Sequence, residues 1–264
     1  MKDTSWGKVA DWYDEVVSDE DSYQKKVILP NILRIVSPKK GLKVLDLACG
    51  QGFFSHEMVK AGAEVVGVDI SKELIAKAAG KKISGERVVG AKHASESESF
   101  FSAAATDLSV LGEKKFDVVF SILAIQNIEN ISKTFKEVSR VLTLAGKLVI
   151  VLNHPTFRIP KKSSWGFDDA YKVQYRRIDE YLSESRADID MNPAEKEKSK
   201  TTISFHRPLQ VYSKTLANAG FAISRIEEWI SHKESQKGPR QIAEDRSRRE
   251  IPLFMCLECV KIGK

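Results

Sequence analysis

The sequence has few cysteines and lacks a long apolar run. Its three cysteines form an odd, low count, which is typical of proteins from a reducing compartment rather than of disulfide-bonded secreted domains. No apolar stretch reaches the ~20 residues that a membrane-spanning helix needs. The first residues, MKDTSWGKVADWYDEVV, carry acidic side chains where a secretory signal would have an apolar centre. We therefore expect a cytoplasmic protein without a membrane span.

The sequence also lacks a convincing metal site. Cys256 and Cys259 form a C-x-x-C pair, but a zinc ion would need two further ligands. The pair lies within IPLFMCLECVKI, an apolar run that is typical of a buried strand rather than of the loop or helix start that a redox site needs. We expect buried thiols here and no metal cofactor.

A one-sided distribution of charge is absent as well. The net charge is +6 and the pI about 9.0, which alone would be compatible with an acidic partner such as RNA. Between Arg158 and Arg207, however, eleven basic residues are interspersed with nine acidic ones. No stripe of Lys and Arg alternates with aromatic residues, so a mildly basic, solvated surface is the simpler interpretation and nucleic acid is not an expected partner.

The sequence does contain a regular alternation of apolar runs with helical segments. Residues 5–37 carry a helical apolar stripe, with Pro30 as a kink or a restart. From residue 43 to residue 154 short apolar runs alternate with helices, of which the longest is expected over residues 129–146. Ser71 is placed to cap another of these helices. The alternation predicts an α/β fold with a parallel, doubly wound sheet covered by helices on both faces.

The stretch VLDLACGQGFF, residues 44–54, ends the first expected strand in a loop with Gly50 and Gly52. One interpretation is a dinucleotide site, because the pattern G-x-G-x-x-S is close to the pyrophosphate-binding fingerprint. Asp69 follows Gly50 by 19 residues, where a ribose-binding acid belongs. The other interpretation is a site for S-adenosylmethionine, which contains no phosphate and needs only the close approach of bare backbone.

Acidic residues at two places favour the second interpretation. Asp46 lies four residues before Gly50, where a carboxylate would repel a pyrophosphate and attract a ligand that carries an ammonium and a sulfonium group. Asp107 and Leu108 follow the third expected strand. An acid followed by an apolar residue there could accept a hydrogen bond from an adenine amino group and cover one face of the ring. An NAD-dependent dehydrogenase needs neither feature.

Five segments in order resemble the successive motifs of class I S-adenosylmethionine-dependent methyltransferases: VLDLACGQGFF, VVGVDIS, ATDLSVL, KFDVVFSILAIQNI and RVLTLAGKLVIVLNHP. The resemblance covers roughly residues 43–155, and LANAGF extends it to the sixth strand. It implies a Rossmann-like, seven-stranded sheet that is mostly parallel, with the last strand antiparallel. It further implies that Gly50 and Gly52 contact the methionine portion of the cofactor and that Asp69, with Ile70, contacts the ribose. Asp107 and Leu108 would hold the adenine, and Ser121 to Gln126 would form one wall of the site.

The rhythm of strands and helices breaks after His154. We expect one domain in four parts: a helical lid (1–40), a cofactor-binding core (41–154), a cap insertion (155–207) and a C-terminal helix with strands that complete the sheet (208–264). Lid and cap should cover the carboxyl ends of the strands, where open α/β sheets bind ligands. A covered pocket suits a small molecule better than a polymer. The arrangement is similar to that of ubiquinone/menaquinone-type methyltransferases.

Candidates for catalysis and substrate contact come from the lid and the cap. His154 follows the fifth expected strand and could act as a general base, because an unperturbed histidine has a pKa near ~6.5. His206 is a second candidate. Tyr13 and Tyr23 could contact the acceptor or the methionine carboxylate. Arg176 and its neighbour Arg177 most simply form a solvated face, although they could also recognise an acidic substrate.

The sequence therefore predicts methyl transfer from S-adenosylmethionine to an O, N or C atom of a small molecule by in-line displacement. The N/D-P-P-Y/F motif that adenine-base methyltransferases commonly carry after the fourth strand is replaced by LAIQNIE. An RNA or protein methyltransferase and a non-catalytic S-adenosylmethionine-binding protein remain as alternatives. The acceptor and the oligomeric state do not follow from the sequence.

Overall fold

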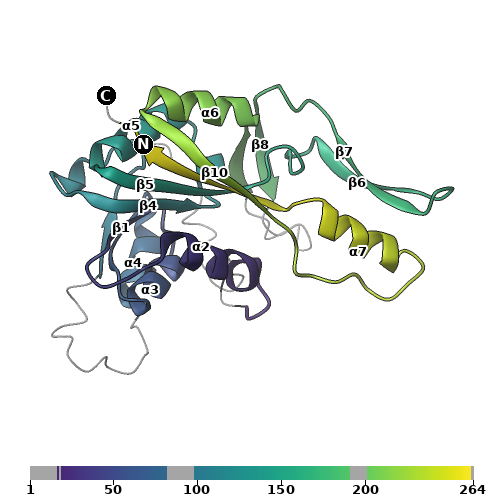
Figure 1. The fold of residues 1–264 in the computed structure, drawn as a ribbon, viewed down its shortest axis with the longest axis horizontal. Helices are drawn as coiled ribbons and strands as arrows, with labels where there is room; N and C mark the ends of the chain where they lie inside the picture. The colour runs from purple at the N-terminus through teal and green to yellow at the C-terminus, as the bar shows by residue number, and fades with distance from the viewer. Residues whose placement is uncertain (1–16, 18, 82–97, 191–200, 263–264) are drawn as a thin grey trace.

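A central sheet organises the computed structural model of the protein, which describes residue 17 and residues 19–81, 98–190 and 201–262 (Figure 1). The sheet has seven strands in the order β10-β11-β5-β4-β1-β2-β3. The five strands from β5 to β3 pair in parallel, whereas β11 is antiparallel to both of its neighbours. This confirms the prediction of a mostly parallel sheet with an antiparallel last strand. The strands are β1 (Lys43–Leu47), β2 (Glu64–Asp69), β3 (Glu98–Ser102), β4 (Phe116–Ile122), β5 (Leu142–Asn153), β10 (Phe221–Trp229) and β11 (Phe254–Lys261).

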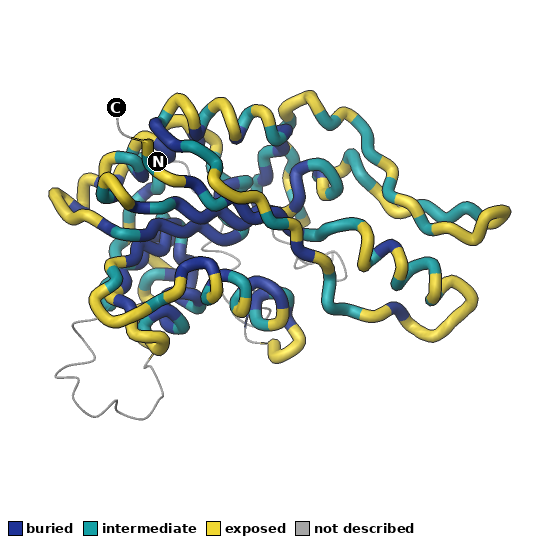
Figure 2. Tube along the Cα trace, viewed as in Figure 1, coloured by how far each residue is buried: buried dark blue, intermediate teal, exposed yellow. Residues whose placement is uncertain are grey.

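Helices cover both faces of the sheet, as the alternating pattern predicts (Figure 1). On one face, side chains of α2 and α3 pack with strand residues such as Val44 and Val149; on the other, α5 and α6 pack with Leu45 and Ile150. Neighbouring strand residues are buried on opposite faces, which explains why these strands are continuous apolar runs. Figure 2 shows the buried centre. The helices of the two faces are α2 (Leu29–Val36), α3 (Phe53–Lys60), α4 (Lys72–Gly80), α5 (Ile131–Val141) and α6 (Leu209–Asn218).

Local sequence signals explain where several helices begin and end. Ser71 caps α4 as expected, with its side chain accepting a hydrogen bond from the backbone of Leu74. The π-helical turn η2 (Gln24–Ile28) runs directly into α2, of which Pro30 is the second residue. The expected helical stretch over residues 5–16, including Tyr13, lies outside the described residues.

The helix expected over residues 129–146 is five residues shorter at its C-terminus than predicted. Asn130 caps α5 by accepting from the backbone of Lys133, and the helix ends at Val141. Leu142 already has extended backbone angles and pairs with Phe116 of β4. The apolar residues that we assigned to the helix therefore begin β5, because pairing with β4 stabilises them there.

The insertion between β5 and α6 forms two hairpins. The first pairs β6 (Ser163–Asp168) with β7 (Val173–Ile178), and the second pairs β8 (Ser185–Asp190) with β9 (Thr201–His206). The polar stretch MNPAEKEKSK, whose sequence predicts an exposed turn between two extended pieces, lies outside the described residues. The first hairpin and α7 (Gln241–Glu250) project together beyond the sheet (Figure 1), joined by the Ser247 hydroxyl, which donates to the carbonyl of Gln174 at 2.8 Å.

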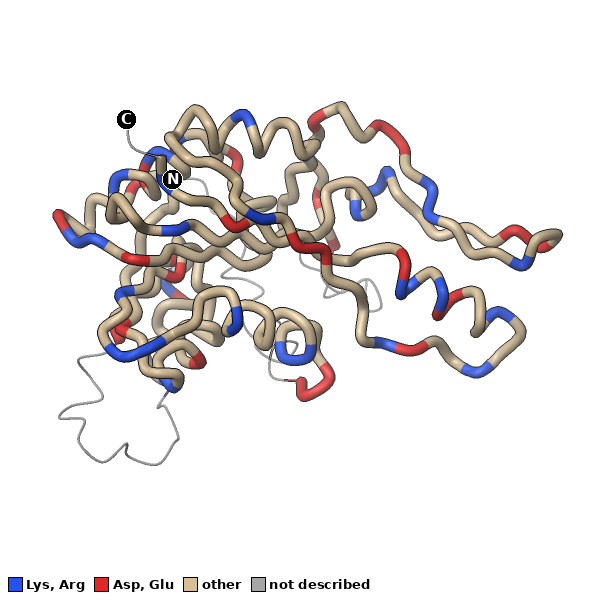
Figure 3. The backbone as a smooth tube through the Cα atoms, in the orientation of Figure 1, with Lys and Arg blue, Asp and Glu red and all other residues tan. Residues whose placement is uncertain are grey.

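Basic and acidic residues are interspersed along the described chain (Figure 3). This agrees with the expectation of a mildly basic, solvated surface. Among the described residues, no helix combines the length and the apolar character that crossing a membrane would require.

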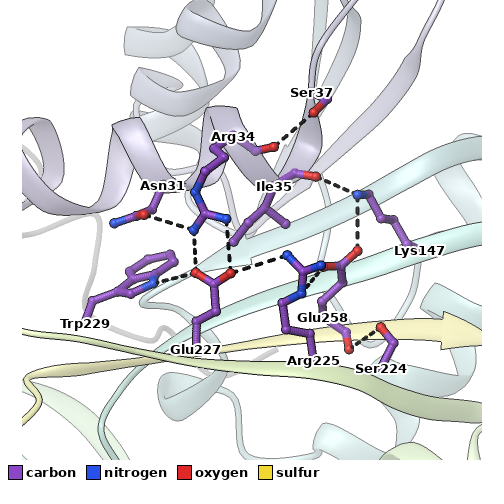
Figure 4. Close-up of polar contacts among 10 residues, drawn as sticks. All are labelled: Asn31, Arg34, Ile35, Ser37, Lys147, Ser224, Arg225, Glu227, Trp229 and Glu258. Atoms are coloured by element: carbon purple, nitrogen blue, oxygen red, sulfur yellow. Dashed lines mark hydrogen bonds and ion pairs between the residues drawn. The ribbon is translucent and has the colours of Figure 1, made fainter.

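A network of charged side chains holds α2 over the β5–β11–β10 side of the sheet (Figure 4). Both guanidinium nitrogens of Arg34 donate to the carboxylate of Glu227, which also accepts from the indole of Trp229 at 3.1 Å. Lys147 on β5 donates to the carbonyl of Ile35 at 2.6 Å. Because these bonds join residues far apart in sequence, they fix the orientation of α2.

We expect the pair of Arg34 and Glu227 to contribute measurably to folding. In a double-mutant cycle of Arg34→Ala and Glu227→Ala, urea unfolding should give a favourable coupling free energy, because the pair is bidentate and joins a helix to a strand far away in the sequence. Arg177→Ala paired with Asp179→Ala is the control, since both side chains are more exposed and the pair lies on one strand end. Equal coupling energies in the two cycles would contradict the assignment.

Candidate cofactor site

A cavity lies at the carboxyl ends of β1, β2 and β4, the edge at which open α/β sheets bind their ligands. One side is formed by the loop after β1, another by the end of β2 and the start of α4. The third side is the segment after β4, with the short helix η4 (Ile125–Asn127). The lining residues are Ala48, Gly50, Asp69, Ile70, Leu74, Ile122, Leu123, Ala124, Asn127 and Ile128.

The loop after β1 has an unusual backbone. Ala48, Gly50 and Gly52 all have positive φ angles, of 60°, 57° and 80°. Gly52 is also tightly packed, since a Cβ atom there would lie 2.8 Å from the ring of His56. Side chains are therefore excluded at Gly52, and the loop presents main chain to the cavity at Gly50, as the glycine pattern predicts.

Asp69 at the end of β2 holds this loop in place. One carboxylate oxygen accepts from the backbone N–H of Gly50 and the other from that of Ser71, both at 2.9 Å. Burial raises the pKa of Asp69, while hydrogen bonds from Ser71, Gly50 and Ile70 act in the opposite direction. Asp69 and Ile70 lie on the cavity wall, where the dinucleotide and the S-adenosylmethionine interpretations both place a ribose-binding acid.

Asp46 takes a different position from the one that our charge argument assumed. Its side chain is almost completely buried and accepts from the hydroxyl of Ser55 on α3 at 2.7 Å. Burial raises the pKa of Asp46 to about 7, with hydrogen bonds from Ser55 lowering it and the charge of Asp69 raising it. Asp46 lies beside the cavity-lining loop rather than on the cavity wall and is only partly ionised near neutrality. Its repulsion of a pyrophosphate is therefore weaker than the sequence argument assumed.

Asp107 and Leu108 are not brought to the cavity. Asp107 is exposed and accepts from the backbone of Ser109, in a separate depression that Lys133 and Arg140 also line. Leu108 is completely buried in the core. The reason is distance along the chain: β3 ends at Ser102, so a turn separates the strand from Asp107. An adenine contact from this pair, which the resemblance implied, does not fit this arrangement.

The wall after β4 lies slightly further along the chain than expected. Ser121 is fully buried within β4, and its hydroxyl has no partner among the described residues. Strand alternation turns it to the opposite face from Phe120 and Ile122. The wall itself starts at Ile122 and includes Asn127 and Ile128, one and two residues beyond the expected stretch.

His154 is engaged by other protein groups. Its Nδ1 atom accepts from the backbone of Thr156 at 3.2 Å, so the proton lies on Nε2, which donates to the carboxylate of Glu228 at 2.7 Å. Burial lowers the pKa of His154, against the opposing effect of Glu228. No ring nitrogen is left for an acceptor, and His154 is not part of the cavity lining. The geometry thus argues against the general-base role.

His206 and Tyr23 also lie outside the cavity lining. His206 ends β9, where its Nε2 atom donates to the carbonyl of Tyr181 at 2.8 Å and ties the second hairpin to the segment before it. Tyr23 contacts the hydroxyl of Ser231 at 3.0 Å, and its ring stands edge-on to Phe254 at 5.7 Å. Tyr23 therefore lies above the β5–β11 side of the same sheet edge.

Two relevant residues were missed by the sequence argument. Ser55 was treated only as a small residue of the glycine pattern, whereas it is the donor that satisfies Asp46. Asn127 lines the cavity and donates to the carbonyl of Ile203 on β9 at 2.7 Å, which docks the second hairpin on the cavity wall. Both contacts depend on tertiary packing, although the spacing of Asp46 and Ser55 was visible.

The strand order, the antiparallel β11 and the acid at the end of β2 beside a glycine loop together define a class I methyltransferase fold. Residues 38–168 match a family model described as a methyltransferase domain. A solved S-adenosylmethionine-dependent methyltransferase from Mesorhizobium loti superimposes with a TM-score of 0.63 at 24% identity, covering 87% of this chain and 95% of that one. Residues 38–168 therefore carry a methyltransferase domain, and the fold is that of solved S-adenosylmethionine-dependent methyltransferases.

Two curated relatives with named activities align with about half of the chain. A ubiquinone biosynthesis O-methyltransferase from Pelagibacter ubique is 30% identical over 46% of this chain and 46% of its own length. A demethylmenaquinone methyltransferase from Clavibacter sepedonicus is 30% identical over 54% of this chain and 57% of its own length. The chain thus spans about half the length of these relatives.

The cavity residues fit the nucleoside portion of the family's cofactor. The buried carboxylate of Asp69 can accept hydrogen bonds from hydroxyl groups, and Ile70, Leu74 and Ile122 offer apolar contact to a flat ring. The described residues contain no group of three His, Cys, Asp or Glu side chains that could hold a metal ion. The expectation that no metal takes part stays a prediction.

Burial of Asp46 should make folding depend on pH. An unfolded aspartate loses its proton near 3.8, whereas folded Asp46 keeps it to a pH of about 7. Between these values the folded state binds the extra proton, so the free energy of unfolding falls as the pH rises. Asp46→Asn removes this contribution. From about pH 4.5 to about pH 7.5, the free energy of unfolding should therefore fall by roughly 2–4 kcal/mol less in the variant than in the wild type.

Urea unfolding of both proteins across that range measures the difference. Glu98, whose pKa burial also raises to about 7, is present in both proteins and cancels. Asp107→Asn is the control, because that carboxyl group is exposed. Parallel stability profiles for wild type and Asp46→Asn would show that Asp46 titrates normally.

Proposed function

We propose that this protein transfers a methyl group from S-adenosylmethionine to a small organic acceptor. The observation that carries the proposal is the cavity at the ends of β1, β2 and β4, in which the buried Asp69 faces a glycine loop. When bound, the cofactor supplies an electrophilic methyl group on a sulfonium. The protein's own contribution is to orient the two reactants and to exclude water around them.

The roles that we propose follow the geometry of the cavity. Asp69 accepts hydrogen bonds from the ribose hydroxyls, with Ile70 beside it. Gly50 and Gly52 let the methionine portion approach the backbone. Asp46, held by Ser55, lies close enough to this loop for a bound cation to lower its pKa. Asp107, Leu108 and Ser121 have no part in this proposal, because their side chains lie elsewhere.

A small-molecule acceptor is supported by two observations. Two relatives that are 30% identical over about half of the chain are named a ubiquinone biosynthesis O-methyltransferase and a demethylmenaquinone methyltransferase. In addition, the β8–β9 hairpin docks on the cavity wall through Asn127. The interspersed charges of Figure 3 give no support to a polynucleotide acceptor. We place the reaction in the cytoplasm, in keeping with three free, buried thiols.

Calorimetry with S-adenosylhomocysteine and with NAD tests the cofactor. We expect binding of the first only, and Asp69→Asn should weaken it about ten-fold or more, since the amide cannot accept from both ribose hydroxyls as a carboxylate does. Asp107→Asn is the matched control and should bind like the wild type. Preferential binding of NAD, or equal affinities in the Asp69 and Asp107 variants, would refute the proposed site.

A methyl-transfer screen distinguishes the acceptor classes. With radiolabelled S-adenosylmethionine, we expect label to enter a low-molecular-weight metabolite fraction and not total RNA or protein. Asp69→Asn should reduce this incorporation and Asp107→Asn should not. Label in RNA or protein would identify a polymer acceptor, and S-adenosylhomocysteine binding without any incorporation would favour the non-catalytic alternative.

A further inference from the structure

Arg158 lies in the helical turn that follows β5. Its backbone N–H donates to the carbonyl of His154 at 2.8 Å, one residue beyond the end of the strand. β5 is the neighbour of β4, whose end walls the cofactor cavity. The turn is therefore at the same edge of the sheet as the cavity, on the side where an acceptor can approach the methyl donor.

Elements from distant parts of the chain meet at this turn. Arg176 on β7 donates Nε to the carbonyl of Phe157 at 2.8 Å and is held further by the hydroxyl of Ser163 at 2.7 Å. Tyr23 packs on Phe254, which pairs with the last residue of β5. Both Tyr23 and Arg176 are within electrostatic range of Arg158. Arg176 therefore meets the chain at the residue before Arg158, and Tyr23 packs beside the end of β5.

No carboxylate balances the charge of Arg158 among the described residues. The acids of the neighbouring segments already have partners: Glu228 accepts from His154, and Asp21 pairs with His232 and Lys233. The side chain of Arg158 is accessible from solvent, yet surrounding protein lowers its pKa by reducing its hydration. An exposed guanidinium without a counter-ion is open to an anionic ligand, which would supply the opposite charge.

We propose that Arg158 binds an anionic group, a carboxylate or a phosphate, of the methyl acceptor. The planar guanidinium can form two parallel hydrogen bonds with either group. Arg176, which backbone and hydroxyl contacts already orient, adds a second positive charge. The anionic group lies over β5 and the reacting atom near the cavity over β1 and β4, so the acceptor carries its charge away from the methylated position. This inference rests on the proposed function, because it assigns a substrate class to the same site.

The test uses the full chain saturated with S-adenosylhomocysteine and three probes of similar size: benzoate, phenyl phosphate and neutral benzamide. By calorimetry, at least one anion should bind about ten-fold more tightly than benzamide, and Arg158→Gln should abolish this preference. Arg177→Gln should retain it, since Arg177 is exposed and paired with Asp179. The tighter of the two anions identifies the preferred group.

The outcomes separate this inference from the proposed function. S-adenosylhomocysteine should bind the Arg158 variant as it binds the wild type, which also shows that the variant is folded. If the cofactor product binds but neither anion is preferred, or if the preference survives Arg158→Gln, the anion site is refuted and the methyltransferase proposal stands. If S-adenosylhomocysteine does not bind the wild type, the proposed function itself fails.

Discussion

The hydrogen bonds that Asp69 accepts from the N–H groups of Gly50 and Ser71 organise the cofactor edge of the sheet. One carboxylate joins the end of β2 to the loop after β1 and to the first turn of α4. Charge-assisted bonds of this kind are short and directional, so they fix a loop that glycine would otherwise leave free. The cavity walls on two sides depend on this one residue, and the same residue remains available to hydroxyl groups of a ligand.

A second acid near the same loop, Asp46, shows how burial changes the ionisation of a side chain that the sequence suggests is charged. Burial raises the pKa of both Asp46 and Asp69, and the charge of Asp69 raises the pKa of Asp46 further. From the sequence, Asp46 is a fixed negative charge that selects against phosphate. In the fold it is a partly protonated group held by Ser55, and it responds to whatever charge approaches the loop.

The part of the chain after β5 connects the cofactor cavity to the part of the sheet edge where we propose that the acceptor binds. Asn127 joins the cavity wall to β9, and Arg207, which is buried, donates to the carbonyls of Ile128 and Glu129 on the same wall. These hydrogen bonds hold β9 and the residue after it against the cavity wall. The first hairpin approaches from the other side and brings Arg176 to the turn that carries Arg158.

The sequence by itself determined the sheet, the glycine loop and Asp69, because strand and helix periodicity and positive-φ glycines act over a few residues. It also indicated extended segments on the two sides of residues 191–200, where β8 and β9 lie. Tertiary structure alone decided that α5 ends at Val141, that Asp107 faces away from the cavity, and that His154 is engaged by Glu228 and Thr156. These outcomes depend on strand pairing and on burial by elements that are distant in the sequence. The local sequence does not specify the hydrogen-bond partner or the solvent exposure that a side chain will have.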